Sequence, residues 1–344
     1  MMTFNELKND VYEIAQAKFG LMTPEFKQRL DVELNAIERY GKTELIVILW
    51  WLFQDLAEKN IYTKLRLYDG YGVSLVCYVL GITLFNPLEH PKLITEQYVL
   101  NTIQELQGVS IKIDVNNPEI IETKIKDWGY EYEKETFGSM RSLMVTANED
   151  ANSDFKIYYQ YRANVCRLQR AYHLDRTLME NIPLDDKDTF DMINELDLYG
   201  TTTTCLAPIT LEALRLIRPE SLGELAIALA FMSEKQYDDL LEFVANRATG
   251  WNNPTGRKEV DDLLTHTNGV LLFSRQKREC LKWLHRSYWD EDKWQVYTTR
   301  VKRLLQSGQV VNKCDTYLEA YNLYKLAYLK LHHPTEFSKI LTTK

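Results

Sequence analysis

Helical periodicity is the feature that most constrains the fold of this chain, because it runs through most of the 344 residues. The clearest example begins at Thr23-Pro24-Glu25, where a capping hydroxyl, a proline at the first helical position and an early acid are typical of a helix start. Apolar residues then recur at i, i+4, i+8 and i+11, and Gly41 is suited to end the helix. A second, more apolar helix is predicted over residues 44–59.

Strand-like alternation is predicted for two short segments in the first third of the chain. Residues 61–67 alternate between apolar and polar side chains, and residues 109–115 do so more clearly. In the second segment valine and isoleucine occupy one face, and Ser110, Lys112 and Asp114 occupy the other. We therefore expect a small sheet built from this part of the chain.

The rest of the sequence favours helices. A turn at residues 69–72 precedes a short buried helix predicted over 74–80. The helical period returns after Pro118, and from Thr210 onward the pattern is nearly all helical, while Asp197 is placed at a strand-like end. The predicted fold is a mostly α-helical α+β protein, and its length suggests two or three domains.

Charge limits the function classes. The net charge of −8 argues against a protein coated with lysine and arginine for binding nucleic acid. The acidity is uneven, however: residues 205–344 carry +3 and residues 1–204 carry −11. Residues 275–303 hold nine basic and four acidic residues, interleaved with tryptophan and tyrosine. This composition suits contact with a nucleic-acid backbone and bases, or equally a solvated helix face above buried aromatics.

Cysteine, histidine and apolar runs exclude several other classes. The five cysteines are widely spaced and the six histidines have no metal-ligand spacing, so neither a disulfide framework nor a zinc site is predicted. The first residues do not resemble a signal peptide, and the longest apolar run, residues 45–53, is too short for a membrane span. We expect a cytoplasmic protein without a membrane partner.

Spacing alone predicts no catalytic centre. Two-metal phosphoryl transfer requires several carboxylates around two cations about 4 Å apart, and the strand at 109–115 offers only Asp114. Asp197, taken by itself, suits a turn or a solvated position equally well. The glycines at 70 and 72 could present backbone amides to a phosphate, although an ordinary turn before a helix has the same pattern.

Two segments carry a specific family resemblance. Residues 29–37, with the sequence RLDVELNAI, resemble the R-L-x-x-E-L-x-x-I helix of the bacterial replicative polymerases of the C family, the DNA polymerase III α subunits. Residues 74–83, SLVCYVLGIT, followed by Asn86-Pro87-Leu88, resemble the G-S-L-V-A-Y-A-L-G-I-T-x-I-x-P-L segment of the same family.

Six further matches follow in the family's order. Residues 109–115 fall where the family has the palm strand P-D-I-D-I-D-F, and residues 136–140 resemble its T-F-G-T-M. Residues 196–200 resemble D-F-L-G, and residues 268–273 resemble Y-G-V-I-V-Y. Near the end, residues 312–315 fall on N-K-S-H and residues 327–337 resemble A-Y-L-K-A-H-Y-P-A-E-F.

The resemblance implies a nucleotidyltransferase-type palm with a small mixed sheet, a helical thumb and helical fingers. The palm would comprise residues 1–116 with 190–204, a shortened thumb residues 117–189, and truncated fingers residues 205–344.

The resemblance also implies that the metal site is degraded. In the family, two aspartates of the palm strand and the aspartate of D-F-L-G bind two magnesium ions; the matching positions here are Ser110, Lys112 and Asp197. Two of three ligands are therefore missing, and a lysine would repel a divalent cation. Asp114 and Asp197 could together hold at most one metal weakly, so no cofactor is expected, and Mg²⁺ only if activity remains.

The nucleotide loop departs from the family as well. Its Gly-Ser pair falls on Asp69-Gly70, just before Ser74, and an aspartate there would repel a triphosphate. Three readings remain open for such a protein. It could be a nucleic-acid- or replisome-binding module without activity, a non-DNA-binding protein that modulates replication proteins, or an active DNA-directed DNA polymerase.

In the first reading the partner is primer–template or single-stranded DNA, together with replication proteins. The basic residues predicted to contact it come from the thumb and the fingers: Arg162, Arg167, Arg170, Arg275, Lys277, Arg278, Lys282, Arg286, Lys302, Arg303 and Lys313.

Overall fold

A computed structural model describes residues 2–59, 61, 63–65, 71–89, 95–105, 108–113, 119–137, 140–146, 154–161, 167–202, 206–251, 258–286 and 310–342. Two compact units make up the chain, residues 1–174 and residues 175–344, and each is described by itself. Among these described residues, helices dominate both units and a single sheet lies in the first, which confirms the mostly helical α+β class.

The first three helices follow the sequence signals closely. Helix α1 (Phe4–Phe19) begins with a capping box between Thr3 and Glu6. Helix α2 (Pro24–Arg39) begins where predicted. The Thr23 hydroxyl accepts a hydrogen bond from the backbone N–H of Phe26, the third residue of the helix. Helix α3 (Thr43–Glu58) is buried along most of its length, as its apolar sequence predicts.

The sheet has five strands in the order β1-β2-β5-β4-β3. Strands β2 and β5 are parallel, and the other neighbours are antiparallel, so the sheet is mixed. The strands are β1 (Thr63–Leu65), β2 (Gly108–Ile113), β3 (Tyr132–Phe137), β4 (Met140–Val145) and β5 (Phe155–Tyr161). One face of the sheet is apolar at its centre, because side chains at alternate positions of β2, β4 and β5 are buried together.

Two secondary-structure expectations were wrong. Strands β3, β4 and β5 occupy residues 132–161, where the sequence pattern indicated a return to helix after Pro118. The expected strand-like end at Asp197 is a turn, in which Leu196 has a positive φ of 62°. The strands β3, β4 and β5 pair with one another in chain order, whereas the turn at Asp197 is held by Lys330, 133 positions away.

Shorter helices complete the first unit. Helix α4 (Leu75–Val79) fills most of the segment predicted as helical over 74–80, and Gly81 follows it with a φ of 76°. The others are α5 (Glu96–Glu105), α6 (Glu119–Asp127) and α7 (Arg167–Leu174), with single 3-10 turns at Tyr71–Val73 and Pro87–Glu89.

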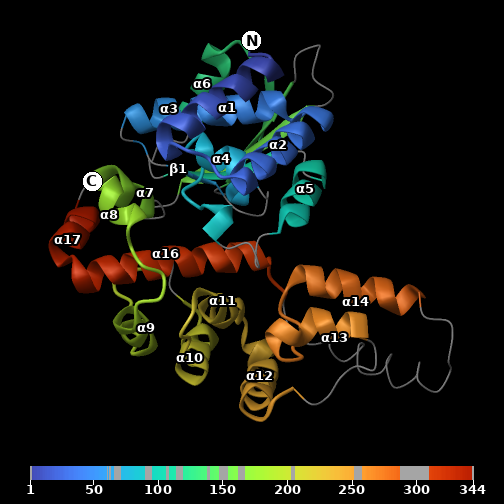
Figure 1. The fold of residues 1–344 in the computed structure, drawn as a ribbon, viewed down its shortest axis with the longest axis vertical. Coiled ribbons are helices and arrows are strands. Elements are labelled where there is room, and N and C mark those ends of the chain that lie inside the picture. The colour runs from blue at the N-terminus through green and yellow to red at the C-terminus, as the bar shows by residue number, and fades with distance from the viewer. Residues whose placement is uncertain are drawn as a thin grey trace. The chain divides into compact units, whose positions relative to one another are not determined.

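The regular elements described in the second unit are all helices, and one isolated bridge joins Phe273 to Val311. The long helix α16 (Lys313–His332) is its central element, and α9 and α11 pack along it (Figure 1). Its members are α8 (Arg176–Glu180), α9 (Lys187–Asn194), α10 (Pro208–Ile217), α11 (Leu222–Ala230), α12 (Tyr237–Thr249), α13 (Lys258–Leu264), α14 (Ser274–Arg286), α16 and α17 (Pro334–Thr342). Buried tyrosines of α16, among them Tyr321 and Tyr324, form much of the core of this unit.

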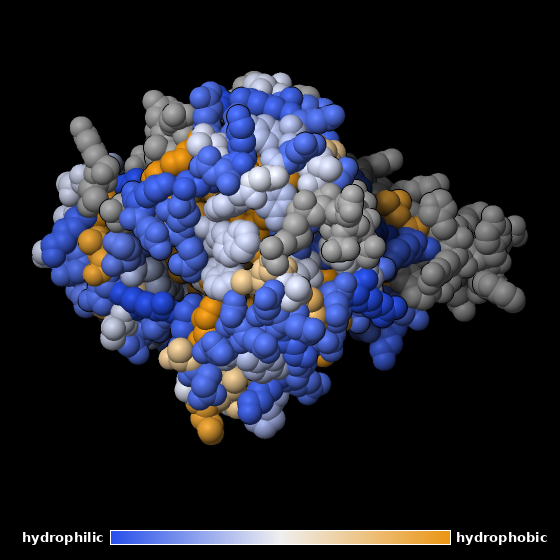
Figure 2. Space-filling view, turned by 90° about the horizontal axis from the view of Figure 1, so that it is seen from above, coloured by the Kyte–Doolittle hydropathy of each residue, from blue (hydrophilic) through white to orange (hydrophobic). Residues whose placement is uncertain are grey.

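The surface is mainly polar where it can be seen. The face in Figure 2 is mostly hydrophilic, with hydrophobic residues in small, separate areas. Within the described part of the chain, no helix combines the length and the apolar character needed to cross a membrane.

Candidate functional site

The strand that the resemblance aligns with the polymerase metal motif is β2. Its residues Val109 and Ile111 are buried, and positions 110 and 112 alternate with them on the other face. Lys112 is the cross-strand partner of Lys64 on β1, and Ser110 is paired with Tyr158 on β5. This part of the sheet therefore carries two lysines in one pair, and Asp114 follows it outside the described residues.

A buried polar network holds the segment that leads into α4. The Ser74 hydroxyl caps α4 by accepting from Cys77 N at 3.3 Å and donates to Glu33 Oε2 at 2.7 Å. Glu33 Oε2 also accepts from Val76 N at 3.3 Å, and Glu33 Oε1 accepts from Arg29 Nε at 2.5 Å. The network joins residues 41 positions apart and links the two segments with the most specific family resemblance.

Burial governs the protonation of this network. Desolvation raises the pKa of Glu33, and the charge of Arg29 with the hydrogen bonds from Ser74, Arg29 and Val76 offsets part of that effect. All three partners donate to the carboxylate, so the ionised form is the one that these contacts stabilise. Asp69 and Gly70, the other two predicted loop residues, lie outside the described residues.

Asp197, the remaining candidate carboxylate, is already paired with a lysine. Lys330 Nζ on α16 lies 2.5 Å from Asp197 Oδ1 and 3.1 Å from its carbonyl oxygen. The Asp197 side chain is 60% exposed, whereas that of Lys330 is 18% exposed. Searching the described residues finds no group of three or more His, Cys, Asp and Glu side chains that could hold a metal ion.

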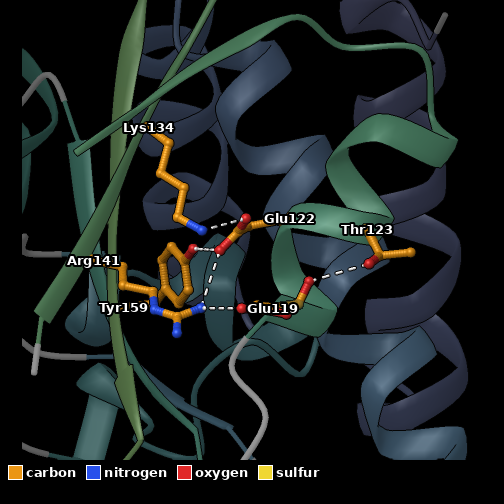
Figure 3. Close-up of polar contacts among 6 residues, drawn as sticks. All are labelled: Glu119, Glu122, Thr123, Lys134, Arg141 and Tyr159. Carbon is orange, nitrogen blue, oxygen red and sulfur yellow. Dashed lines mark hydrogen bonds and ion pairs between the residues drawn. The ribbon is translucent and has the colours of Figure 1, made fainter. Parts of the chain in front are cut away.

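A second polar cluster fixes α6 to the sheet (Figure 3). Glu122 on α6 accepts from Lys134 Nζ of β3 at 2.8 Å and from the Tyr159 hydroxyl of β5 at 2.5 Å. Arg141 on β4 lies 3.3 Å from Glu122 and 3.3 Å from Glu119. Three strands are thus bound to one helix through a single carboxylate.

This cluster shifts the titration of its members. Desolvation acts to raise the pKa of Glu122, but the hydrogen bonds from Lys134 and Tyr159 and the charges of Lys134 and Arg141 outweigh it and lower the pKa. Burial, with the neighbouring Glu122 carboxylate, raises the pKa of the Tyr159 phenol. Within the Glu122–Tyr159 pair the carboxylate is therefore charged at neutral pH, and the tyrosine hydroxyl is its hydrogen-bond donor.

Helix α14 presents the most concentrated set of positive charges among the described residues. Arg275, Arg278 and Lys282 are exposed, and with Arg286 they recur at i, i+3, i+7 and i+11, which places the four positions on one face. We call these four positions the α14 basic stripe. Lys277 is half-buried beside it. Glu279, whose nearest contact is Lys282 Nζ at 2.9 Å, is the only acidic residue on this helix.

A buried glutamine fixes the start of α14. Gln276 Oε1 accepts from Leu272 N and Phe273 N at 3.0 and 2.9 Å, and its Nε2 donates to Leu263 O at 3.0 Å. A parallel bridge between Phe273 and Val311 then places the start of α14 beside the start of α16. Lys313, the first residue of α16, is thereby brought near the beginning of the α14 basic stripe.

The other predicted basic residues are separate from this stripe. Arg167 and Arg170 lie one turn apart on α7 in the first unit, where both are half-buried. Arg162, Lys302 and Arg303 lie outside the described residues. The structure therefore groups only the α14 residues and Lys313.

Three residues of these sites were missed by the sequence reasoning: Lys330, Gln276 and Glu122. Lys330 pairs with Asp197 across 133 positions, for which a single sequence holds no signal. In the sequence Gln276 stands among charged residues of the same helix, and only its burial in the fold separates it from them. Glu122 is one of two acids at the start of α6, and nothing in the pattern separates it from Glu119.

Comparison with known proteins gives a consistent result. The family described as the bacterial DNA polymerase III alpha NTPase domain matches residues 5–190, more than half of the chain. The DNA polymerase III subunit alpha of Thermotoga maritima is 23% identical over 400 aligned residues, which cover 92% of this chain and 46% of that protein. The Mycoplasma pneumoniae protein of the same name is 32% identical over 104 residues, covering 28% of this chain and 11% of that protein. The chain thus spans less than half the length of these relatives.

Proposed function

Because the chain belongs to the bacterial DNA polymerase III alpha family, we propose that it is a polymerase-like replication protein that binds nucleic acid without transferring nucleotides. The observation that carries the proposal is the composition of β2, in which the family resemblance aligns Ser110 and Lys112 with two metal-binding aspartates. The α14 basic stripe supplies the surface that would bind nucleic acid.

The residues at the metal positions do not fit a pair of magnesium ions. Hard divalent cations require several oxygen ligands, and the family site uses carboxylates for most of them. Here Lys112 is paired with Lys64 in the sheet, so this pair contributes two cationic residues and no carboxylate. A lysine at a metal position brings a positive charge that repels a divalent cation.

Asp197, the remaining carboxylate, is bound to a lysine rather than being available to a metal ion. Asp197 is neutralised by Lys330 and its turn is closed by the same lysine. A metal bound to Asp197 would have to displace that ammonium or share the carboxylate with it, and either costs binding energy. We therefore assign Asp197 a structural role and derive no catalytic step from it.

The α14 basic stripe favours nucleic acid as the partner. Its four positions extend over three turns of helix, about 16 Å, which is enough to meet roughly two or three phosphates along one strand. The stripe lies on the half of the chain with a positive net charge, whereas a uniformly acidic protein would repel a phosphate backbone. The buried Gln276 gives the stripe a rigid base.

A fluorescence-anisotropy titration tests the binding half. The probe is a labelled single strand of about 20 nucleotides, measured beside a primer–template duplex at about 50 and 200 mM salt. The test variant combines Arg275→Glu, Arg278→Glu and Lys282→Glu. The matched control combines Lys27→Glu, Lys126→Glu and Lys187→Glu, three exposed lysines whose substitution makes the same change in net charge.

We expect the unmodified protein to bind at ~50 mM salt and to lose affinity steeply by ~200 mM. The test variant should bind at least about tenfold more weakly, with a salt slope smaller by about 2, because roughly three phosphate contacts are removed. The control variant should stay within about threefold of the unmodified protein. Failure to bind at ~50 mM salt, or equal losses in both variants, would refute the nucleic-acid surface.

A further inference from the structure

Exposed apolar side chains gather on and beside helix α12 of the second unit. Among the described residues, nine large hydrophobic side chains are exposed, and four of them belong to α10, α12 and the segment between them. Tyr237 and Leu241 on α12 are 45% and 44% exposed, Leu216 on α10 is 39% and Met232 is 54%. Isolated exposed apolar residues need no explanation, whereas a contiguous group marks an interaction site.

The group is contiguous along α12. Tyr237, Leu241, Val244 and Ala248 recur at i, i+4, i+7 and i+11, so they form one stripe along three turns, about 16 Å. We call these four residues the α12 apolar stripe. The inward face of the same helix is formed by other residues, including Leu240 and Phe243, which are buried. The stripe is therefore not needed for the core of this unit.

Neighbouring segments extend the stripe at both ends. Met232 is held one turn before α12 by its N–H, which donates to Gln236 Oε1 at 2.9 Å. At the other end Arg247 donates to the carbonyl oxygen of Ile217, which brings the end of α10 and its exposed Leu216 beside α12. Figure 1 shows α10 and α12 as neighbours.

Acidic side chains border the stripe. Asp238 is exposed and Glu242 is half-exposed; each follows a residue of the stripe by one position. Within the described part of the chain neither carboxylate has a salt-bridge partner. Charged residues at the border of an interface favour partners of opposite charge, so Asp238 and Glu242 favour lysine or arginine on the partner. The same carboxylates disfavour a nucleic acid or an anionic lipid surface.

We propose that the α12 apolar stripe, with its acidic border, is a docking site for a basic amphipathic helix of a partner protein. Apolar residues of such a helix would pack on Tyr237 and Leu241, and its cationic residues would meet Asp238 and Glu242. The site is separate from the α14 basic stripe, so it does not depend on whether nucleic acid binds there.

The test uses the full chain and three labelled synthetic helices of about 18 residues. One has leucine on one face and lysine on the other, the second has glutamate in place of lysine, and the third is a scrambled leucine–lysine sequence. Binding is measured by anisotropy for the unmodified protein, for Leu241→Asp and for the Asp238→Lys, Glu242→Lys pair. Leu331→Asp, at a site 40% exposed on α16, is the matched control.

We expect the leucine–lysine helix to bind at least about tenfold more tightly than the other two, with a tenfold loss for Leu241→Asp and none for Leu331→Asp. The lysine pair should reverse the preference toward the leucine–glutamate helix. Equal binding of the scrambled peptide, or equal losses in both leucine variants, would overturn the proposal. A dimer in light scattering that Leu241→Asp dissociates would also overturn it, because the occupant would then be a second copy.

Discussion

Lys330 Nζ lies 2.5 Å from Asp197 Oδ1 and also contacts the carbonyl oxygen of the same residue. The pair connects α16 to the turn after α9 within the second unit. The resemblance aligns Asp197 with a metal-binding aspartate, and in this chain a lysine already supplies the positive charge. If the two residues form a structural ion pair, substituting either one should lower stability. If Asp197 is a metal ligand, Mg²⁺ should stabilise the protein once Lys330 is removed.

Lys330→Met and Asp197→Asn should each lower stability slightly. Because Asp197 is 60% exposed, the pair is screened by solvent and is worth about 1 kcal/mol or less. In urea unfolding, the double variant should lose less than the sum of the two single losses, since each substitution breaks the same pair. Strict additivity would mean that the two residues do not interact. Stabilisation by Mg²⁺ that appears only with Lys330→Met would instead identify Asp197 as a metal ligand.

Glu33→Ala should be one of the most damaging single substitutions in the first unit. It leaves the Arg29 guanidinium buried without its carboxylate and removes the acceptor of Ser74, so we expect a loss of about 3–5 kcal/mol in the free energy of unfolding. Asp55→Ala is the matched control. That carboxylate pairs with Lys124 and Lys59 nearer the surface, and its loss should cost about 1 kcal/mol. Similar losses for the two variants would contradict the role given to the buried network.

Glu122 should contribute to the decline of stability in acid. Its pKa is lowered in the folded protein from an ordinary value near 4.5, so its contribution is present above that pH and is lost as the pH falls through the folded pKa. Glu122→Gln should therefore lower Tm at pH 7 and flatten the fall in Tm as the pH drops below about 4.5. Glu133→Gln, at an exposed position of β3, should leave the curve unchanged. Parallel curves for Glu122→Gln and the unmodified protein would show that the cluster is not linked to folding.

Gly269→Ala should destabilise the second unit by more than backbone strain alone. Gly269 has a φ of 85°, and a Cβ there would overlap the indole of Trp251, so the indole has to move. Gly20→Ala separates the two effects, because Gly20 has a φ of 66° and nothing within 4 Å of the added carbon. We expect about 1–2 kcal/mol for the Gly20 variant and at least about 1 kcal/mol more for the Gly269 variant, with altered tryptophan fluorescence. Equal losses would mean that the indole is not packed as described.

Local signals were enough to predict α2, α3 and α4. Each depends on residues close in sequence: a Thr23 or Ser74 cap, a proline at the helix start, or a continuous apolar face. The alternation of apolar and polar residues also predicted β2, and the structure buries Val109 and Ile111 on one face. These elements require little information from the rest of the fold.

The strands β3 to β5 were missed for different reasons. Strand β5 does alternate, with Phe155, Ile157 and Tyr159 buried, and this signal was available in the sequence. The described side chains of β3 are mostly polar and exposed; its stability comes from pairing with β4 and from the contact between Lys134 and Glu122. Such a strand has no apolar period of its own, and only its partners reveal it.

For the candidate sites as well, the sequence indicated some features, and others depend on contacts made only in the fold. The chemistry of Ser110, Lys112 and Asp197 was evident from the aligned motifs, and their roles stay predictions. Lys330, which fixes Asp197, comes from a segment 133 positions away and could not be chosen from a single sequence. Glu33 and Gln276 lie within the motif and the helix that the sequence had already marked, but their partners become evident only in the fold. The α12 apolar stripe has a helical period in the sequence, but exposure distinguishes it from an ordinary core face.

A primer-extension assay decides whether the chain transfers nucleotides. The purified protein is incubated with a labelled primer–template, all four deoxynucleotides and either Mg²⁺ or Mn²⁺, beside Asp197→Ala and the Ser110→Asp, Lys112→Asp pair. We predict no extension by the unmodified protein with either metal, under conditions in which it binds the DNA. Extension by the unmodified protein that Asp197→Ala abolishes would contradict the account, because Asp197 would then serve catalysis and the chain would be an active polymerase.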